Sequence, residues 1–263
     1  IMLGSYSQNA LSGAATVNQI FFIVNQLALS IGNALVAICS QYWGKQETGA
    51  IRKMTGVALA LSVLIGAIVV TACTCIPEQL LRIFTTSPEI IAEGKAYLGL
   101  LKWTFLLFMI SNLLIAMLRS VETVKISFVI SVVSLITNGC INYTLIFGHF
   151  GFPEMGIQGA AVGTLTARML ELLIIVVYIW KIDTKVRLFD INLFRTIFLP
   201  ENRKIRGAFF KVAFPIMCSG MIWAISVPMQ TAILGHLSAD AIAANSVSST
   251  FFQYLKVIVI AIS

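Results

Sequence analysis

The sequence predicts an all-α integral membrane protein, a polytopic helical bundle. Of its 263 residues, 58% are hydrophobic and only 11% are charged, and the mean hydropathy is +0.92. Soluble domains carry about 25% charged residues. Repeated apolar runs of roughly 20 residues match the helix length that crosses a hydrocarbon core about 30 Å thick. The runs lack the two-residue alternation of a membrane β-barrel, so we expect the spans to be helices.

Seven apolar segments are expected to form helices, and the connectors between them hold most of the charges and turn residues. The segments are 10–40, 54–76, 94–118, 127–147, 159–180, 209–234 and 242–263. Residues 1–4 are expected to be the end of an earlier helix. The chain opens without Met and stops inside an apolar run, so we expect it to be a fragment of a longer protein.

Lys and Arg fall unevenly on the two sides of these segments. Thirteen of the 18 lie in or beside the connectors at 41–53, 119–126 and 181–208, and three lie in the alternate connectors or their helix ends. Because an excess of Lys and Arg marks cytoplasmic connectors, we expect these connectors in the cytoplasm and the chain in the plasma membrane. The bias also explains the net charge of +7. The lipid bilayer is therefore an expected partner, and nucleic acid is not.

A weak internal repeat divides the chain. The residue pairs that share one offset are Leu3 and Leu234, Gly4 and Gly235, Ser7 and Ser238, Ala10 and Ala241, and Phe21 and Phe252. Both copies fall at an outer turn between two helices, so parallel repeats are expected, as in many secondary transporters. We expect an N-lobe at 1–180, a cytoplasmic connector at 181–208 and the start of a C-lobe at 209–263.

No arrangement of residues predicts an enzyme or a metal centre. The five cysteines fall in or beside apolar segments, and Cys73 and Cys75 point to different sides of a helix, unlike a pair of metal ligands. The sequence has no glycine-rich phosphate cradle, no metal-type histidine pair and no Ser-His-Asp order. We therefore expect a non-enzymatic protein without a metal site.

The stretch from Asn138 to Thr164 combines buried amides with a run of glycines. Asn138 and Asn142 are one helical turn apart and share a face of an otherwise apolar helix. An unpaired buried amide costs about 1–3 kcal/mol, and inside a membrane such residues mark a cavity or an ion path. A tight outer loop is expected next, with Gly148, Gly151, Pro153, Gly156 and Gly159 spaced through it.

Five further amides lie on the first long segment. Asn18, Asn25 and Asn33 are seven and eight residues apart. On a helix they therefore project within roughly 60° of one another, and Gln19 and Gln26 lie beside them. The stripe either lines a hydrated substrate cavity or forms interhelical hydrogen bonds, which contribute about 0.6 kcal/mol each.

Arg168 and Glu171 are the charged pair deepest in an expected helix, three residues apart. Burying either charge without a partner is costly in a membrane, so we expect the two to pair with each other or with a neighbouring helix.

Several motifs together resemble the multidrug and toxic compound extrusion (MATE) family of transporters. In the family's order they are Leu3-Gly4, Gln41-Tyr42-Trp43-Gly44-Lys45, Arg119-Ser120 with Lys125, the 138–164 stretch and Phe214-Pro215. The resemblance implies a twelve-helix antiporter with two parallel six-helix lobes, the second of them truncated here, and a chain that runs from the end of helix one to part of helix eight. It also implies that external Na⁺ or H⁺ is exchanged for cytoplasmic drugs or other organic compounds, often cations. We expect a monomer and no further cofactor.

The resemblance also implies a cation-coupling site in the N-lobe. Asn138 matches the family's helix-five Asn, and Asn142 stands where the family often has Asp. Asn112 and Thr164 match an Asn of helix four and a Thr of helix six. Asn142 can bind Na⁺ through its carbonyl oxygen but no proton at neutral pH, which leaves the proton to a helix-one Asp expected before the chain begins. Trp223 stands near the Glu of one family branch, where it either stacks on cationic drugs in the cavity, or faces lipid or packs against neighbours.

The sequence leaves two other functions open besides export. A lipid-linked saccharide flippase of the same superfamily needs a cationic cavity for a pyrophosphate, and this chain offers few cations within helices, chiefly Arg168 and Lys256. A non-transporting membrane scaffold would have an apolar, close-packed interior, so a cavity lined by amides would count against it.

Overall fold

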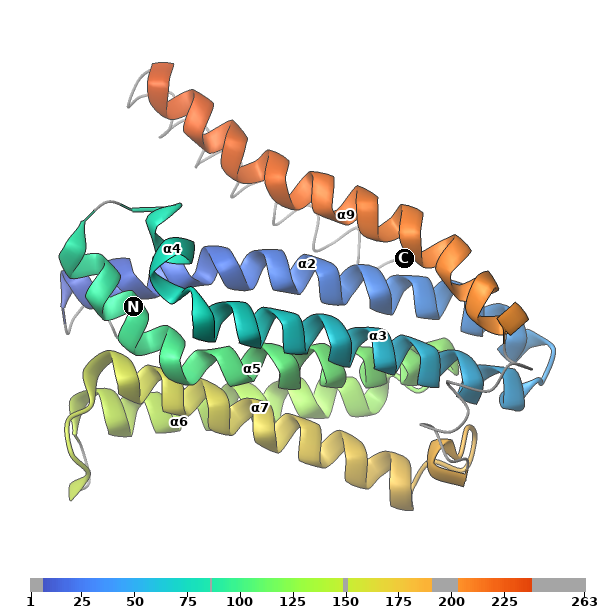
Figure 1. Cartoon of the computed structure of the whole chain (residues 1–263). Helices are drawn as coiled ribbons and strands as arrows, with labels where there is room; N and C mark the ends of the chain where they lie inside the picture. The colour runs from blue at the N-terminus through green and yellow to red at the C-terminus, as the bar shows by residue number, and fades with distance from the viewer. Residues whose placement is uncertain (1–6, 86, 149–150, 191–202, 238–263) are drawn as a thin grey trace. The chain divides into compact units, whose positions relative to one another are not determined.

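Six helices in the described part of the chain are long and apolar enough to cross a membrane. The computed structural model describes residues 7–85, 87–148, 151–190 and 203–237. The long helices are α2 (Gln8–Gly44), α3 (Thr48–Cys75), α5 (Pro88–Ser120), α6 (Lys125–Phe147), α7 (Gly156–Lys181) and α9 (Arg203–Leu237), shown in Figure 1. A short helix, α4 (Pro77–Arg82), and a single 3-10 turn, η2 (Leu188–Asp190), lie between them.

The all-α membrane fold and the first six predicted segments are thereby confirmed. The seventh segment, 242–263, and the helix end expected at 1–4 lie outside the described residues. The division into lobes at 1–180 and 209–263 stays a prediction. In the structure the chain forms two compact units, Ile1–Cys218 and Ser219–Ser263.

Three helices begin six residues earlier than the apolar pattern indicates. α3 starts at Thr48 rather than 54, α5 at Pro88 rather than 94, and α9 at Arg203 rather than 209. Hydropathy marks the part of a helix within the lipid, whereas long basic side chains let a helix continue into the interface. A proline at the first position also starts both α4 and α5, where its missing N–H is not needed. The connector expected at 77–93 is consequently largely helical.

The turn between α6 and α7 uses glycines for two different purposes. Gly148 ends α6 with φ 68°, and Gly151 and Gly156 have φ 82° and 52°, backbone conformations that favour glycine. Gly159 lies in the first turn of α7. A Cβ there would lie 2.8 Å from the backbone carbonyl of Leu145, so Gly159 allows α6 and α7 to approach closely, as small residues do between membrane helices.

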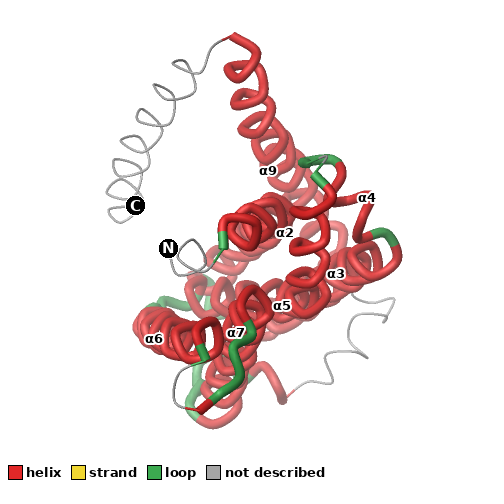
Figure 2. The backbone as a smooth tube through the Cα atoms, turned by 90° about the vertical axis from the view of Figure 1, so that its left-hand side faces the viewer, coloured by secondary structure: helices red, strands yellow, loops and turns green. Residues whose placement is uncertain are grey.

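Helix α5 is the centre of the first unit. It packs along α2, α3 and α7, and α6 packs against α7 (Figures 1 and 2). Side chains of α5 that are almost completely buried include Leu98, Phe105 and Met109. Where α2 meets α5, a Cβ on Gly13 would lie 2.9 Å from the backbone nitrogen of Gly94. The two backbones therefore pack without side chains between them.

Helix α6 has one polar face and one broad apolar face. Ile130 and Ile146 are its buried residues, while Phe128, Leu135 and Ile136 are exposed. Exposed apolar side chains on a membrane helix are suited to lipid or to another part of the protein. The face that meets α7 carries the two predicted asparagines.

Candidate functional site: two polar cavities beside helix α7

Asn138 and Asn142 lie together with Thr164 at the α6–α7 interface. The amide of Asn142 donates through Nδ2 to Oδ1 of Asn138 at 3.0 Å. Asn138 Nδ2 donates to the hydroxyl of Thr164 at 3.3 Å, and that hydroxyl donates to the carbonyl of Ala160 at 2.9 Å. The structure therefore joins three of the four residues predicted for cation coupling into one hydrogen-bonded chain.

One oxygen of this cluster has no partner. Asn142 Oδ1 is buried and has no hydrogen-bond partner in the described part of the protein. It occupies the space beside Gly163, where a Cβ would collide with it. A buried amide oxygen without a donor costs about 1–3 kcal/mol. A bound cation, which needs oxygen ligands, would remove that cost.

A cavity of about 420 Å³ adjoins this cluster and draws residues from four helices. Asn138, Asn142 and Thr164 line it together with Asn18 of α2 and Tyr97 of α5. Tyr97 is buried and shares the wall of this cavity with Thr164. The sequence reasoning missed Tyr97, although a tyrosine within the apolar segment 94–118 was an available signal because a buried phenol needs a hydrogen-bond partner.

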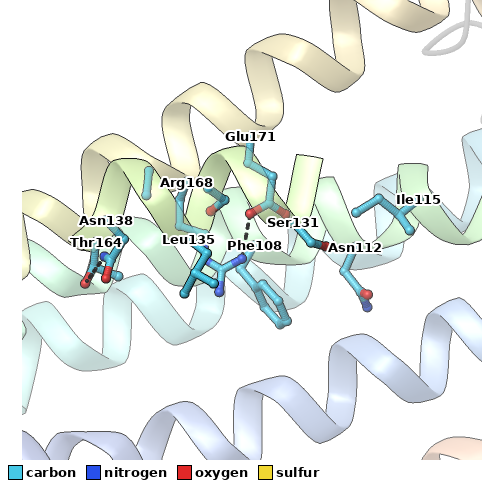
Figure 3. A pocket seen from close by; sticks show the side chains of 11 residues that line it. Phe108, Asn112, Ile115, Ser131, Leu135, Asn138, Thr164, Arg168 and Glu171 are labelled. Carbon is cyan, nitrogen blue, oxygen red and sulfur yellow. Dashed lines mark hydrogen bonds and ion pairs between the residues drawn. The ribbon is translucent and has the colours of Figure 1, made fainter. Parts of the chain in front are cut away.

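Asn112 is separated from the asparagine pair. It lines a second cavity, of about 490 Å³, to which Asn138 and Thr164 also contribute. Figure 3 shows Asn138 and Thr164 at one end of this cavity and Asn112 toward the other, with Arg168 and Phe108 between them. Asn112 Nδ2 is buried and has no partner among the described residues. The structure therefore does not bring Asn112 into the Asn138–Asn142 cluster.

Arg168 and Glu171 pair with each other, and Glu171 also reaches a neighbouring helix, as expected for buried charges in a membrane. Arg168 Nη1 lies 2.6 Å from Glu171 Oε2. The hydroxyl of Ser111 on α5 donates to Glu171 Oε1 at 2.9 Å, and the guanidinium carbon of Arg168 is 4.8 Å from the centre of the Phe108 ring. Sequence reasoning did not identify Ser111 and Phe108, because their contact with α7 depends on the rotation of α5.

The amide stripe of α2 lies on a face that is open in the structure. Asn18, Gln19 and Asn33 are exposed, and Asn25 and Gln26 are half-buried. No side-chain hydrogen bond joins these amides to another described helix, and Asn18 is the one that lines a cavity described above. Trp223, on the part of α9 in the second unit, is exposed as well. Their roles in a substrate cavity stay predictions.

Membrane-length helices that enclose polar cavities define the class of this protein, a polytopic helical membrane protein. The MatE family model matches residues 1–144, more than half of the chain. The chain belongs to the multidrug and toxic compound extrusion (MATE) family.

Curated relatives carry transport names. A protein of Thermotoga maritima named probable multidrug resistance protein NorM is 27% identical over 246 residues, which are 93% of this chain and 51% of the relative. A protein of the same name from Rhizobium meliloti is 25% identical over 95% of this chain and 53% of its own length. The chain therefore spans about half the length of the curated relatives it matches.

Solved structures support the fold. A MOP superfamily transporter from Pyrococcus furiosus superposes with a TM-score of 0.82 at 18% identity, over 96% of this chain and 54% of that one. A multidrug resistance MATE family transporter in an outward-facing conformation gives 0.80 at 17% identity, over 93% and 52%. The first unit therefore has the helix arrangement of this family.

Proposed function

We propose that the whole protein is an antiporter that couples Na⁺ or H⁺ entry to the export of organic, often cationic, compounds. Family membership and the multidrug resistance names of the relatives support this proposal. Rocking of two lobes around a central cavity would expose that cavity to each side in turn. As in the sequence analysis, we expect a monomer, cytoplasmic connectors at 41–53, 119–126 and 181–208, and no further cofactor.

The unpartnered Oδ1 of Asn142 is the observation that supports cation coupling most directly. It is buried within a bundle of apolar helices, on a side chain whose Nδ2 donates to Asn138, and Asn138 in turn donates to the hydroxyl of Thr164. Amide and hydroxyl oxygens are suitable ligands for hard cations, and a neutral amide does not take up a proton at neutral pH. The described residues of this site therefore suit Na⁺, whereas H⁺ coupling would need the helix-one Asp that the family resemblance implies.

The two other functions fit the structure less well. A flippase would need a strongly cationic cavity for a pyrophosphate, whereas among the described residues Arg168 is the one cation lining either of the two cavities described above, and Glu171 offsets its charge. A scaffold would have a close-packed apolar interior, and two cavities lined by Asn138 and Thr164 count against it.

Transport of ethidium by the full-length protein in proteoliposomes tests the proposal. We expect Asn138→Ala and Thr164→Ala to raise the half-saturating concentration of the coupling ion about tenfold, because each loses one polar ligand worth roughly 1–2 kcal/mol. Thr166→Ala is the matched control, since its exposed hydroxyl on the same helix bonds only the Val162 carbonyl in the described structure. Unchanged dependence on both Na⁺ and H⁺ in the two site variants would refute this site.

A further inference from the structure

The cavity beside Arg168 and Glu171 differs in character from the one beside Asn142. It lies among α5, α6 and α7, and Figure 3 shows the ion pair in its wall. Arg168 and Glu171 are the charged residues that line it, and the other lining residues are uncharged, among them Ser131, Ser134 and Asn112. Its electrostatic properties therefore depend on which member of the pair a ligand can reach.

Arg168 is the member that a ligand reaches. Its side chain is 27% exposed, against 7% for Glu171. Both carboxylate oxygens of Glu171 are already engaged, one by Arg168 and one by Ser111. Arg168 commits Nη1 to Glu171, and its remaining N–H groups have no hydrogen-bond partner in the described parts of the chain. The cavity consequently presents unused donors on a cation rather than an unused carboxylate.

The two cavities differ in whether their unpaired polar atoms accept or donate hydrogen bonds. Beside Asn142 the unsatisfied atom is an acceptor, Oδ1, which suits a cation. In the Arg168 cavity the groups without a partner among the described residues are donors, the remaining N–H groups of the guanidinium. Asn138 and Thr164 line both cavities, and Arg168 follows Thr164 by one turn of α7.

We propose that Arg168 binds the carboxylate of an exported compound. This subsite rests on the proposed export function. It adds organic acids and zwitterions to the compounds that the protein exports. A planar guanidinium pairs with a carboxylate through parallel hydrogen bonds. Glu171 and the Phe108 ring hold the guanidinium in place, and Ser111 holds Glu171. An uncompensated charge is costly in a membrane interior. The negative charge of the ligand is therefore offset by the ligand's own ammonium group or by the coupling cation in the adjacent cavity.

A matched pair of dyes tests the subsite: a rhodamine with a free carboxylic acid, and its methyl ester. Binding to the purified full-length protein is measured by fluorescence polarisation, and transport is measured separately in proteoliposomes. We expect Arg168→Gln to weaken binding of the acid about tenfold, the effect of one lost charge-assisted interaction, and to leave the ester unchanged. Glu171→Gln should strengthen binding of the acid, because it frees the guanidinium.

Two further variants keep the test decisive. If Arg168→Gln fails to fold because it leaves Glu171 unpaired, the neutral double variant Arg168→Gln with Glu171→Gln provides the same comparison. Arg119→Gln, at the exposed end of α5, is the control for loss of a guanidinium. If the acid bound equally well to the wild type and to the Arg168 variants, the subsite would be wrong. Export of the ester would then still support the export function. If instead the wild type bound the acid through Arg168 but exported neither dye, the export function would be contradicted.

Discussion

Asn142 can take its position only because residue 163 has no side chain. A Cβ built on Gly163 would collide with Asn142 Oδ1, which is also the unpartnered oxygen of the candidate cation site. The glycine therefore controls the position of a ligand atom on another helix. Gly159, one turn earlier, faces the backbone of Leu145 instead, so the two glycines differ in what a substitution would disturb.

Gly163→Ala should displace the Asn142 side chain and break its 3.0 Å hydrogen bond to Asn138. We expect the full-length protein to lose roughly 1–3 kcal/mol of stability, as is typical of overpacking, and to unfold at a lower temperature in detergent. Adding Asn142→Ala should restore part of the loss by removing the colliding atom. Gly139→Ala, with no atom within 4 Å of its added Cβ, is the control. Identical unfolding temperatures for Gly163→Ala and Gly139→Ala would contradict the contact.

At the scale of elements, the segment after α7 fastens the ends of three helices. The ammonium of Lys185 donates to the carbonyl of Val121, at the end of α5, at 2.7 Å and lies 5.5 Å from the centre of the Trp43 ring, at the end of α2. Arg52 of α3 donates through Nε to the carbonyl of Val186, whose side chain is buried. The start of the predicted cytoplasmic connector is therefore an ordered part of the bundle.

Lys185→Met should loosen this segment while keeping a side chain of similar length. Loss of the bond to Val121, about 1.5–3 kcal/mol for a charged donor, should speed amide hydrogen exchange of residues 183–190 roughly tenfold or more, since local opening governs exchange there. Lys181→Met is the control, because that ammonium is exposed and lies over the ring of its neighbour Trp180. If exchange in 183–190 stayed at the wild-type rate, the Lys185 contact would not hold the segment.

Helices were predictable from sequence because hydropathy depends on composition alone, whereas contacts depend on how each helix is rotated. The start of α6 lies two residues before the expected segment 127–147, and its end agrees. The pairing of Arg168 with Glu171 was predictable because both residues lie on one helix. Residues that other helices contribute to the two cavities and to the ion pair, such as Tyr97 and Ser111, were not predicted. Asn112 shows the same limit, since it faces a cavity but not the asparagine pair it was expected to join.

At the scale of the whole molecule, the orientation in the membrane decides which ends of the cavities meet the cytoplasm. The excess of Lys and Arg predicts that the α2–α3 turn and the segment after α7 are cytoplasmic, and that the α6–α7 turn is outside. In the first unit, the membrane-length helices run in alternating directions along the chain, as Figure 1 shows, so successive connectors fall at opposite ends of the bundle. The contacts of Lys185 with the ends of α2 and α5 agree, since they place three connectors on one side.

Cysteine labelling of the full-length protein in intact cells tests this orientation. In a background without native cysteines, Glu154→Cys in the α6–α7 turn should react with a membrane-impermeant maleimide. Glu47→Cys, between α2 and α3, should react only after the membrane is permeabilised. Both side chains are exposed in the structure, so permeabilised cells, in which both should label, provide the control for reactivity. The physical basis is that Lys and Arg are retained on the cytoplasmic side during insertion. Labelling of Glu47→Cys but not Glu154→Cys in intact cells would invert the assignment and place the 181–208 connector outside.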